Sequence, residues 1–213
     1  MESKNVRLTY FNLNGLAAIP RMLLNHGNIK FEDRRLSSEE WAKVKETLNF
    51  KFLPCLEIDG VQYCESLAIN FYLARKIGNL LGKTPEDEYC ILSALTTWSD
   101  FGSKIVARAF NKGDQKENTE ALLTGIKKIA GGLENIYSRN GSGTYFLGDT
   151  MSLADFYLVY VFGYKLMSEK NFSDATEEFK NNAPKLYKAI EGLYKSDTFV
   201  KLFEKSLIKD ASI

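Results

Sequence analysis

The spacing of apolar residues changes along the chain, and each change predicts a new element. Apolar residues alternate with polar ones at 6–10, which is the period of a half-buried strand, and a second strand is expected at 29–34. Between these stretches, apolar residues recur at helical spacing over 19–23, and Gly27 stands where a helix would end. The chain is therefore expected to begin as strand, helix and strand.

A β-hairpin followed by a helix is predicted over 55–75. The apolar residues of its first strand alternate with polar ones, and Asp59-Gly60 is a typical two-residue turn because both residues tolerate a positive φ. After the returning strand the apolar spacing becomes helical. Glu65-Ser66 thus lie where a strand ends and a helix begins, and the free N–H groups and dipole of such a junction attract a carboxylate.

These elements together predict an α/β fold of the thioredoxin-like plan. A short helix is added by the capping box of Ser37 with Glu40, and the resulting order favours a four-stranded mixed sheet. Folds of this plan usually carry out thiol chemistry just after the first strand. That position holds Tyr10 and no cysteine, so a thiol supplied by the ligand fits better.

From residue 85 onward the pattern is helical only. Thr84 as N-cap and Pro85 at the first helical position form a strong helix start, which predicts a domain boundary: an α/β domain over 1–80 and an all-α domain over 85–213. Another capping box joins Ser152 to Asp155, whose role is expected to be structural. The expected helices are about 85–111, 117–139, 152–169, 184–195 and 198–207.

Composition excludes several classes of function. The 213 residues are 45% apolar and carry 28 basic against 27 acidic side chains, which argues against a broad cationic surface for nucleic acid. The start lacks the apolar region of a secretory signal, and no apolar run reaches the ~18 residues of a membrane span. We expect a cytoplasmic protein, with no membrane association, whose cysteines are reduced and buried: Cys55, Cys64 and Cys90. The single His26 excludes a histidine-rich metal site.

Four segments resemble cytosolic glutathione transferases, most of all the sigma class, which also contains haematopoietic prostaglandin D synthases and S-crystallins. The segments are Leu8–Asn12, Leu53–Gly60, Glu65–Ile69 and Ser152–Phe156, and their order and spacing make them far more specific than any one alone. The resemblance implies a detoxifying transferase that forms a homodimer. Glutathione would be its co-substrate, with no other cofactor and no metal, bound on the first domain. A hydrophobic electrophile would enter a site to which the helical domain contributes.

Tyr10 matches the tyrosine whose hydroxyl donates to the glutathione sulfur. A hydrogen bond to a charged group is worth roughly 1.5–3 kcal/mol, and one pKa unit is about 1.4 kcal/mol. Such a bond therefore lowers a thiol pKa by about one to two units. The alternative is that Tyr10 is simply a half-buried strand aromatic.

The matching peptide-binding residues lie at Leu53-Pro54 and Glu65-Ser66. In the family, the main chain before a cis-proline pairs with the cysteinyl unit of glutathione like an added strand. Ser66, by its hydroxyl and amide, and Glu65, by its carboxylate, match residues that hold the γ-glutamyl end. The alternatives are a proline that merely begins a strand and a serine that merely caps a helix.

Three further residues match positions around the two ends of glutathione. Lys45 and Trp41 match a cation and an indole that reach the glycine end. Asp100 matches an acid that reaches the γ-glutamyl ammonium from the neighbouring subunit. The alternatives are Trp41 in the core, Lys45 as a solvated charge, and Asp100 in a surface pair with Lys104.

The sequence also departs from the family pattern. The tyrosine is usually followed by an Arg-Gly-Arg-Ala-Glu run, whereas 14–18 read Asn-Gly-Leu-Ala-Ala, with Arg21 kept. Phe52 stands where lysine or glutamine is common. Both changes make the pocket less positive, which leaves a second reading open: a weakly active or non-catalytic ligand-binding or structural protein, like an S-crystallin.

The metal-binding acids of the prostaglandin D synthases do not carry over. The matching positions hold Thr96, Ser99 and Asp100, and a single acid does not hold a hard cation. We therefore do not expect that synthase activity.

Overall fold

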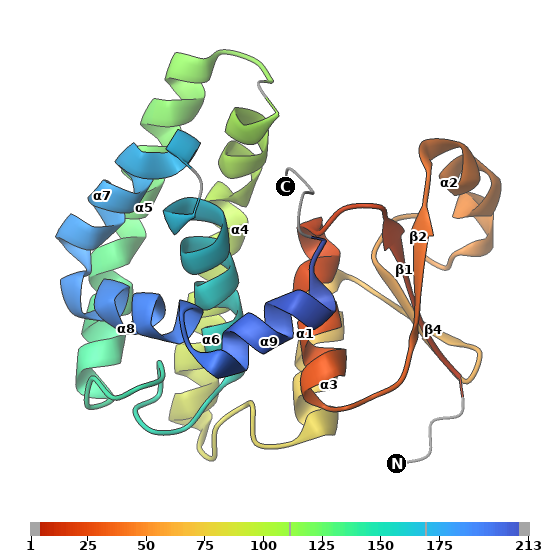
Figure 1. The fold of residues 1–213 in the computed structure, drawn as a ribbon, viewed down its shortest axis with the longest axis horizontal. Helices are drawn as coiled ribbons and strands as arrows, with labels where there is room; N and C mark the ends of the chain where they lie inside the picture. Colours follow the sequence, from red (N-terminus) through yellow and green to blue (C-terminus); the bar gives the residue numbers. More distant parts are fainter. Residues whose placement is uncertain (1–4, 111, 169, 209–213) are drawn as a thin grey trace. The chain divides into compact units, whose positions relative to one another are not determined.

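The computed structural model describes residues 5–110, 112–168 and 170–208, apart from the side chains of 98–101 and 104 (Figure 1). The chain folds as two compact units. The first contains the residues up to Gly78 together with the segment that starts at Lys201, and the second runs from Asn79 to Val200. The division of labour between a glutathione domain and an acceptor domain stays a prediction.

A four-stranded mixed sheet forms the centre of the first unit, which confirms the predicted plan. Its order is β2-β1-β3-β4, with β1 parallel to β2 and antiparallel to β3, and with β3 antiparallel to β4. The strands are β1 Val6–Phe11, β2 Glu32–Leu36, β3 Cys55–Ile58 and β4 Val61–Cys64. The expected turn is present, because Asp59 and Gly60 both have positive φ, 49° and 84°.

Short helices complete the first unit: η1 Gly15–Ala17, α1 Ala18–His26, α2 Ser38–Val44, η2 Lys45–Thr47 and α3 Ser66–Ile77. Leu8 and Leu56 of the sheet are fully buried, as are Met22 of α1 and Ile69 of α3. The second strand begins later than predicted. The end of α1 accounts for this, since the Ile29 N–H donates to Leu24 O at 2.9 Å.

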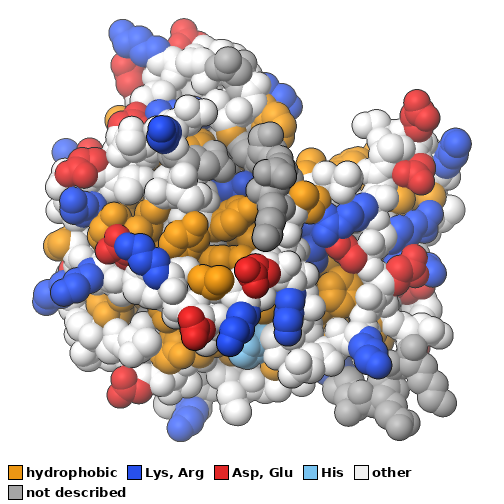
Figure 2. Space-filling view, viewed as in Figure 1, with side chains coloured by type: hydrophobic (Ala, Val, Ile, Leu, Met, Phe, Trp, Pro, Cys, Tyr) orange, Lys and Arg blue, Asp and Glu red, His pale blue; other side chains and the backbone are white. Residues whose placement is uncertain are grey.

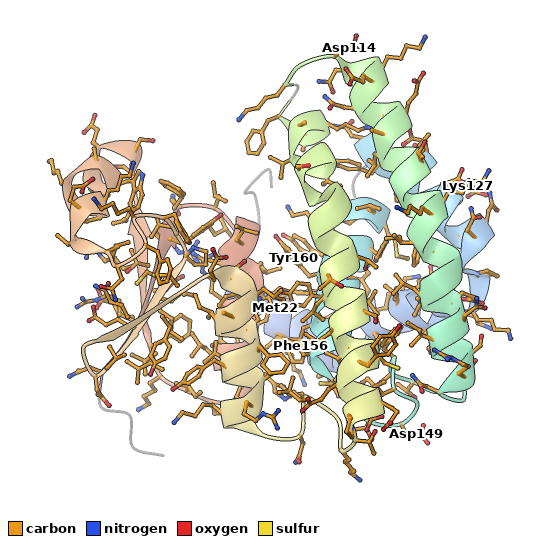
Figure 3. All side chains as sticks on the ribbon, turned by 180° about the vertical axis from the view of Figure 1, so that it is seen from behind. Met22, Asp114, Lys127, Asp149, Phe156 and Tyr160 are labelled. Carbon is orange, nitrogen blue, oxygen red and sulfur yellow. The ribbon has the colours of Figure 1, made fainter. Side chains whose placement is uncertain are left out.

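The second unit is helical, as predicted. Its helices are α4 Pro85–Ala109, α5 Gln115–Arg139, α6 Leu153–Leu158, η3 Val159–Met167, η4 Lys170–Phe172, α7 Ser173–Asn182, α8 Pro184–Tyr194 and the start of α9 Asp197–Ser206. The segment predicted as one helix over 152–169 changes at Val159 to the wider hydrogen bonding of a π-helix. Lys127 points outward from α5 in Figure 3, whereas Phe156 is fully buried.

Helix α7 was not predicted. Among its ten residues only Ala175 and Phe179 are buried, so its sequence carries too few apolar positions to reveal the helical period. Its place is fixed by tertiary packing instead. The ring of Phe179 stacks on that of Phe162, with 3.9 Å between the ring centroids.

The Ser152–Asp155 capping box is present and buried. The Asp155 carboxylate accepts from the Ser152 N–H at 2.7 Å, from the Ser152 hydroxyl at 3.0 Å, and from the Phe146 N–H at 2.7 Å. Burial raises the pKa of Asp155 to about 6, against the effect of these hydrogen bonds. Asp155 therefore ties the loop before α6 to the start of that helix, which is a structural role.

Charges of both signs are interspersed over the face drawn in Figure 2, in keeping with the near balance of acidic and basic residues. No helix in the described part of the chain combines the length and the apolar character that crossing a membrane requires.

Candidate functional site

Tyr10 stands near the end of β1 and is 8% exposed. Its hydroxyl oxygen accepts a hydrogen bond from the Leu16 N–H at 3.2 Å. This contact orients the hydroxyl proton away from the Leu16 amide, toward another acceptor. Burial raises the pKa of the phenol, while the Leu16 N–H and the charge of Arg21 act in the opposite direction. The phenol is therefore protonated at neutral pH and can donate a hydrogen bond.

Gly15 permits the close approach of this loop to Tyr10. It has a φ of +41°, and a Cβ added there would lie 2.8 Å from the Tyr10 hydroxyl oxygen and 2.6 Å from Leu13 Cδ1. A side chain at this position would push against the phenol and would also strain the backbone. The loop after β1 is thus built to place a main-chain N–H on the tyrosine oxygen.

Arg21 supports the same loop from inside the first unit. Its side chain is 1% exposed and pairs with Asp33, with 3.0 Å between Nε and Oδ1. It also donates from Nη1 to the carbonyl of Leu13 at 2.9 Å. A buried cation, paired with a carboxylate that also pairs with Arg35, therefore holds the loop that follows Tyr10.

The sheet brings three of the predicted segments to one edge. Thr9 pairs with Cys55, and Cys55 pairs with Cys64. Continuing these antiparallel ladders by one residue sets Tyr10 beside Pro54, and Pro54 beside Glu65. Two strand spacings are about 10 Å, which is also about the length of three extended residues. The span of this edge is therefore comparable with the length of an extended tripeptide.

The Leu53-Pro54 peptide bond is cis, which settles the isomer that the sequence leaves open. Both residues are buried. Glu65 is the N-cap of α3, makes no side-chain capping hydrogen bond, and has a φ of +70°. Such a conformation is costly for a residue with a side chain and is often found at functional sites. Ser66 is the first helical residue, so its amide lies at the open end of α3.

Trp41 and Lys45 follow β2, the strand that pairs with β1 on the side opposite β3. Trp41 belongs to α2 and is half-buried, with its ring edge-on to Phe11 at 5.9 Å between centroids. That contact holds α2 against the residue that follows Tyr10. Lys45 is exposed at the start of η2. Asp100 lies in α4, but its side chain is outside the part of the chain that the structure describes.

Sequence reasoning missed the main-chain donor to Tyr10 and the partner of Asn14. The side chain of Asn14 is fully buried and forms hydrogen bonds with the main chain of Ile208 in both directions. The sequence carried one partial signal, the glycine directly after Asn14 in a loop. Nothing local pointed to Ile208.

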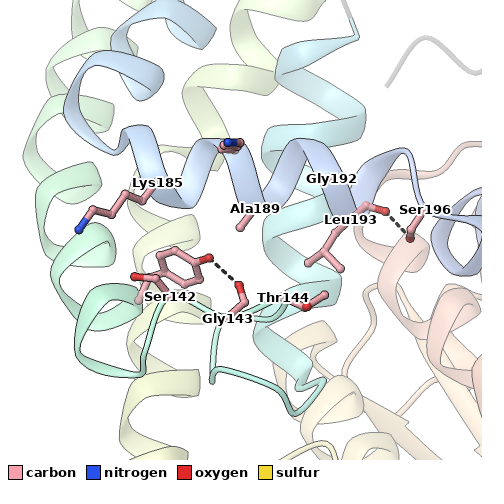
Figure 4. Close-up of a pocket in the computed structure, with 10 residues that line it drawn as sticks. Ser142, Gly143, Thr144, Lys185, Ala189, Gly192, Leu193 and Ser196 are labelled. Carbon is pink, nitrogen blue, oxygen red and sulfur yellow. Dashed lines mark hydrogen bonds between the residues drawn. The ribbon is translucent and has the colours of Figure 1, made fainter.

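A groove of about 400 Å³ in the second unit contains none of the predicted site residues (Figure 4). The 142–144 loop lines one side and α8 the other. Two hydroxyls beside it are used internally: Tyr137 donates to Gly143 O and Ser196 to Leu193 O, both at 2.6 Å. In Figure 4 Lys185 extends away from the groove. These features do not favour a polar ligand there.

Comparisons with known proteins match both parts of the chain. Residues 6–75 match the glutathione S-transferase N-terminal domain, and residues 99–207 match the glutathione S-transferase C-terminal domain. The haematopoietic prostaglandin D synthase of Gallus gallus is 37% identical over 153 residues, which are 72% of this chain and 75% of that protein. Glutathione S-transferase 1 of Ascaris suum is 35% identical over 155 residues, 70% of this chain and 74% of that protein.

A solved structure extends the match to nearly the whole chain. Monomeric Na-GST-3, a glutathione S-transferase of Necator americanus, superposes with a TM-score of 0.81 at 29% identity, covering 97% of this chain and 99% of that one. Both domains of the family are therefore present here in the same order. This chain belongs to the glutathione S-transferase family.

Proposed function

We propose that this protein adds the thiolate of glutathione to hydrophobic electrophiles, with Tyr10 stabilising the thiolate. The observation that carries the proposal is the hydroxyl of Tyr10, a buried phenol whose oxygen accepts the Leu16 N–H at 3.2 Å. A phenol that accepts one hydrogen bond is polarised, and its own proton is more readily shared with an anion. Tyr10 therefore acts as a donor to sulfur rather than as a base.

The remaining residues would hold the tripeptide across the edge of the sheet. The main chain of Leu53, before Pro54, pairs with the cysteinyl unit. Glu65 attracts the γ-glutamyl ammonium, and the amide of Ser66 at the start of α3 receives the γ-glutamyl carboxylate. The positive φ of Glu65 and the absence of a side-chain capping hydrogen bond from it support this role.

At the glycine end, Lys45 supplies a cation and Trp41 an indole wall. The edge-on contact of Trp41 with Phe11 supports this placement, because it ties the indole to the strand that carries Tyr10. Asp100 would act on the γ-glutamyl ammonium of the partner subunit's ligand. The thiol proton leaves to water, the sulfur then attacks the electrophilic carbon, and the displaced group departs with its electron pair.

The homodimer, the sigma class and a cytoplasmic, detoxifying role are part of the same proposal. Three free, buried cysteines support a reducing compartment. Large apolar side chains exposed on the chain, among them Phe50, Phe52 and Tyr89, support contact with a second copy. Light scattering at micromolar protein would give twice the chain's mass, whereas one chain mass would remove the dimer and with it the role of Asp100.

A ligand-binding protein without catalysis is the second candidate. It is favoured by Phe52, which is 39% exposed where a polar contact to glutathione would be expected, and by Asn14, whose amide is occupied by Ile208. Calorimetric titration with glutathione separates the two. Absence of heat at millimolar glutathione would reject the transferase.

The decisive experiment is conjugation of a dinitrophenyl halide by the parent protein and by Tyr10→Phe across pH. The variant keeps the ring and removes the donor, so turnover should fall by roughly ten- to a thousand-fold, as on loss of an oxyanion donor. The fall should shrink at high pH, where glutathione ionises without help. Equal activity of the two proteins at neutral pH would remove Tyr10 from the mechanism.

A further inference from the structure

We propose that Asn14 is a positioning residue: its side-chain amide clamps the C-terminal segment onto the loop after β1 and thereby keeps the Leu16 N–H on the hydroxyl of Tyr10. The inference rests on the proposed function of Tyr10 and adds to it a second part of the chain, 194 residues away in sequence. Both partners belong to the first structural unit.

The clamp consists of two hydrogen bonds in opposite directions. Asn14 Nδ2 donates to the carbonyl of Ile208 at 3.1 Å, and the Ile208 N–H donates to Asn14 Oδ1 at 2.9 Å. The amide thus pairs with both main-chain groups of one residue, as a residue of a neighbouring strand would. Asn14 is fully buried, and a buried amide is costly unless its polar atoms are bonded. The amide and the C-terminal segment therefore fix each other.

Asn14 precedes by two residues Leu16, whose N–H bonds Tyr10, so a short stretch of main chain links the clamp to the tyrosine. The Asn14 carbonyl accepts from the Ala17 N–H at 3.1 Å, closing the turn η1. Leu16, whose N–H bonds the Tyr10 hydroxyl, lies inside this turn. Loss of the two Asn14–Ile208 hydrogen bonds would therefore allow the turn η1 to move, and with it the Leu16 N–H that bonds Tyr10.

The clamp also explains the residue type at this position. An amide both donates and accepts, whereas a guanidinium only donates and an aliphatic side chain does neither. Arginine could bond the Ile208 carbonyl but could not receive the Ile208 N–H. Asparagine, where the family usually has arginine, is thus matched to the main chain of this C-terminal segment.

A second attachment of the same segment offers a matched control. Asn25 of α1 donates from Nδ2 to the Ser206 hydroxyl at 3.0 Å. This bond also holds the end of α9, but it has no part in the turn beside Tyr10. Asn25→Ala should loosen the segment without changing the aim of the Leu16 N–H.

The test compares Asn14→Ala, Asn14→Asp, Asn25→Ala and a chain ending at Leu207. The readouts are the pKa of enzyme-bound glutathione, followed by the ultraviolet absorbance of its thiolate, and the pH profile of kcat/KM. In Asn14→Ala and in the shortened chain, the thiol pKa should rise by up to about one unit, equal to about ten-fold less kcat/KM at neutral pH. Asn14→Asp, which keeps the acceptor but sets a second oxygen against the Ile208 carbonyl, should raise the thiol pKa at least as much, and Asn25→Ala should match the parent.

Combining Asn14→Ala with the shortened chain should add nothing to either change alone, because both break the same contact. Additive effects, or a folded Asn14→Ala with the parent's thiol pKa, would overturn the proposal. Hydrogen exchange of the Leu16 and Ile208 amides tests the clamp without any activity: both should exchange faster in Asn14→Ala, and unchanged exchange would also overturn it. If exchange responds while Tyr10→Phe leaves the thiol pKa unaltered, the role of Tyr10 fails and the clamp stands.

Discussion

Cys55 lies directly opposite Cys64 in the antiparallel ladder of β3 and β4. Both side chains are buried, at 2% and 7% exposure. Pro54 precedes the first cysteine and Glu65 follows the second, so this pair fixes the register of the two segments proposed to hold glutathione. The thiols themselves are buried in the sheet.

The reactivity of Cys55 should be very low in the folded protein. Burial, with a contribution from the neighbouring Cys64, raises the pKa of Cys55 to about 12. At pH 7 the thiolate fraction is then about 10⁻⁵, against a few per cent for an ordinary thiol. Alkylation by iodoacetamide, followed for each cysteine-containing peptide by mass spectrometry, should be at least about a hundred-fold slower at Cys55 than in urea. Equal rates in the folded and unfolded protein would contradict the burial.

Gly15→Ala should damage both stability and activity. The new methyl group would meet the Tyr10 hydroxyl at 2.8 Å, and a φ of +41° costs a side-chain-bearing residue about 1–2 kcal/mol. We expect conjugation to fall by about ten-fold or more, because the phenol must move. Steady-state kinetics and urea unfolding measure the two effects.

Gly131→Ala is the control for that substitution. Gly131 lies within α5, and a Cβ there has no heavy atom within 4 Å. Alanine should therefore stabilise the protein by about 0.5–1 kcal/mol and leave kinetics unchanged. A Gly15→Ala protein that behaves like Gly131→Ala would show that the loop tolerates a side chain.

Glu65→Gly should make the protein more stable and worse at binding glutathione. Glycine adopts the φ of +70° without the cost of about 1 kcal/mol or more that glutamate bears, although glycine's more flexible unfolded chain offsets part of that gain. Removal of the carboxylate should weaken glutathione binding by about ten-fold, since a hydrogen bond to a charged group is lost. Calorimetry and urea unfolding test the two parts.

Glu65→Gln separates the effect of the side-chain charge from the effect of the strained backbone conformation. It keeps the strained φ and removes only the charge, so it should weaken binding without gaining stability. If Glu65→Gly were less stable than Glu65→Gln, the strain argument would be wrong.

Asp155 should make the stability of the protein depend on pH between about 4 and 6. Its pKa is about 6 in the folded protein and 3.8 as a reference value. The folded state thus holds the proton more tightly than the unfolded state, so the contribution of Asp155 to the free energy of unfolding falls as pH rises through this window, by up to about 3 kcal/mol. Urea unfolding of parent and Asp155→Asn at several pH values isolates this contribution, because other groups titrate equally in both. Parallel pH dependences would show that Asp155 does not titrate in this range.

Much of the fold followed from local pattern. The alternation of apolar residues, the Asp59-Gly60 turn and the capping boxes each depend on residues near in sequence, and all are present in the structure. Helix α7 escaped prediction because it buries only two side chains. The change to π-helical hydrogen bonding at Val159 escaped because it leaves no clear mark on apolar spacing.

The candidate site likewise contains residues that the sequence predicts and contacts that only the structure shows. Tyr10 and the segments around Pro54 and Glu65 were found from motifs, and the sheet register then set them side by side. The donor to Tyr10 is a main-chain amide, which any residue type provides, so no sequence pattern could name Leu16. The pairing of Asn14 with Ile208 joins opposite ends of the chain, and only the folded structure reveals it.

The first unit is discontinuous in sequence, since it is completed by the segment that starts at Lys201. The ribosome must translate all of Asn79–Val200 between the two parts, which takes on the order of ten seconds at typical rates of protein synthesis. During that time the residues of the sheet have no α9 to complete their unit, and Asn14 lacks Ile208, its partner in the proposed clamp. On the proposed clamp, the phenol of Tyr10 gains its orientation only after Ile208 has been translated, so a chain that stops before that residue would lack it.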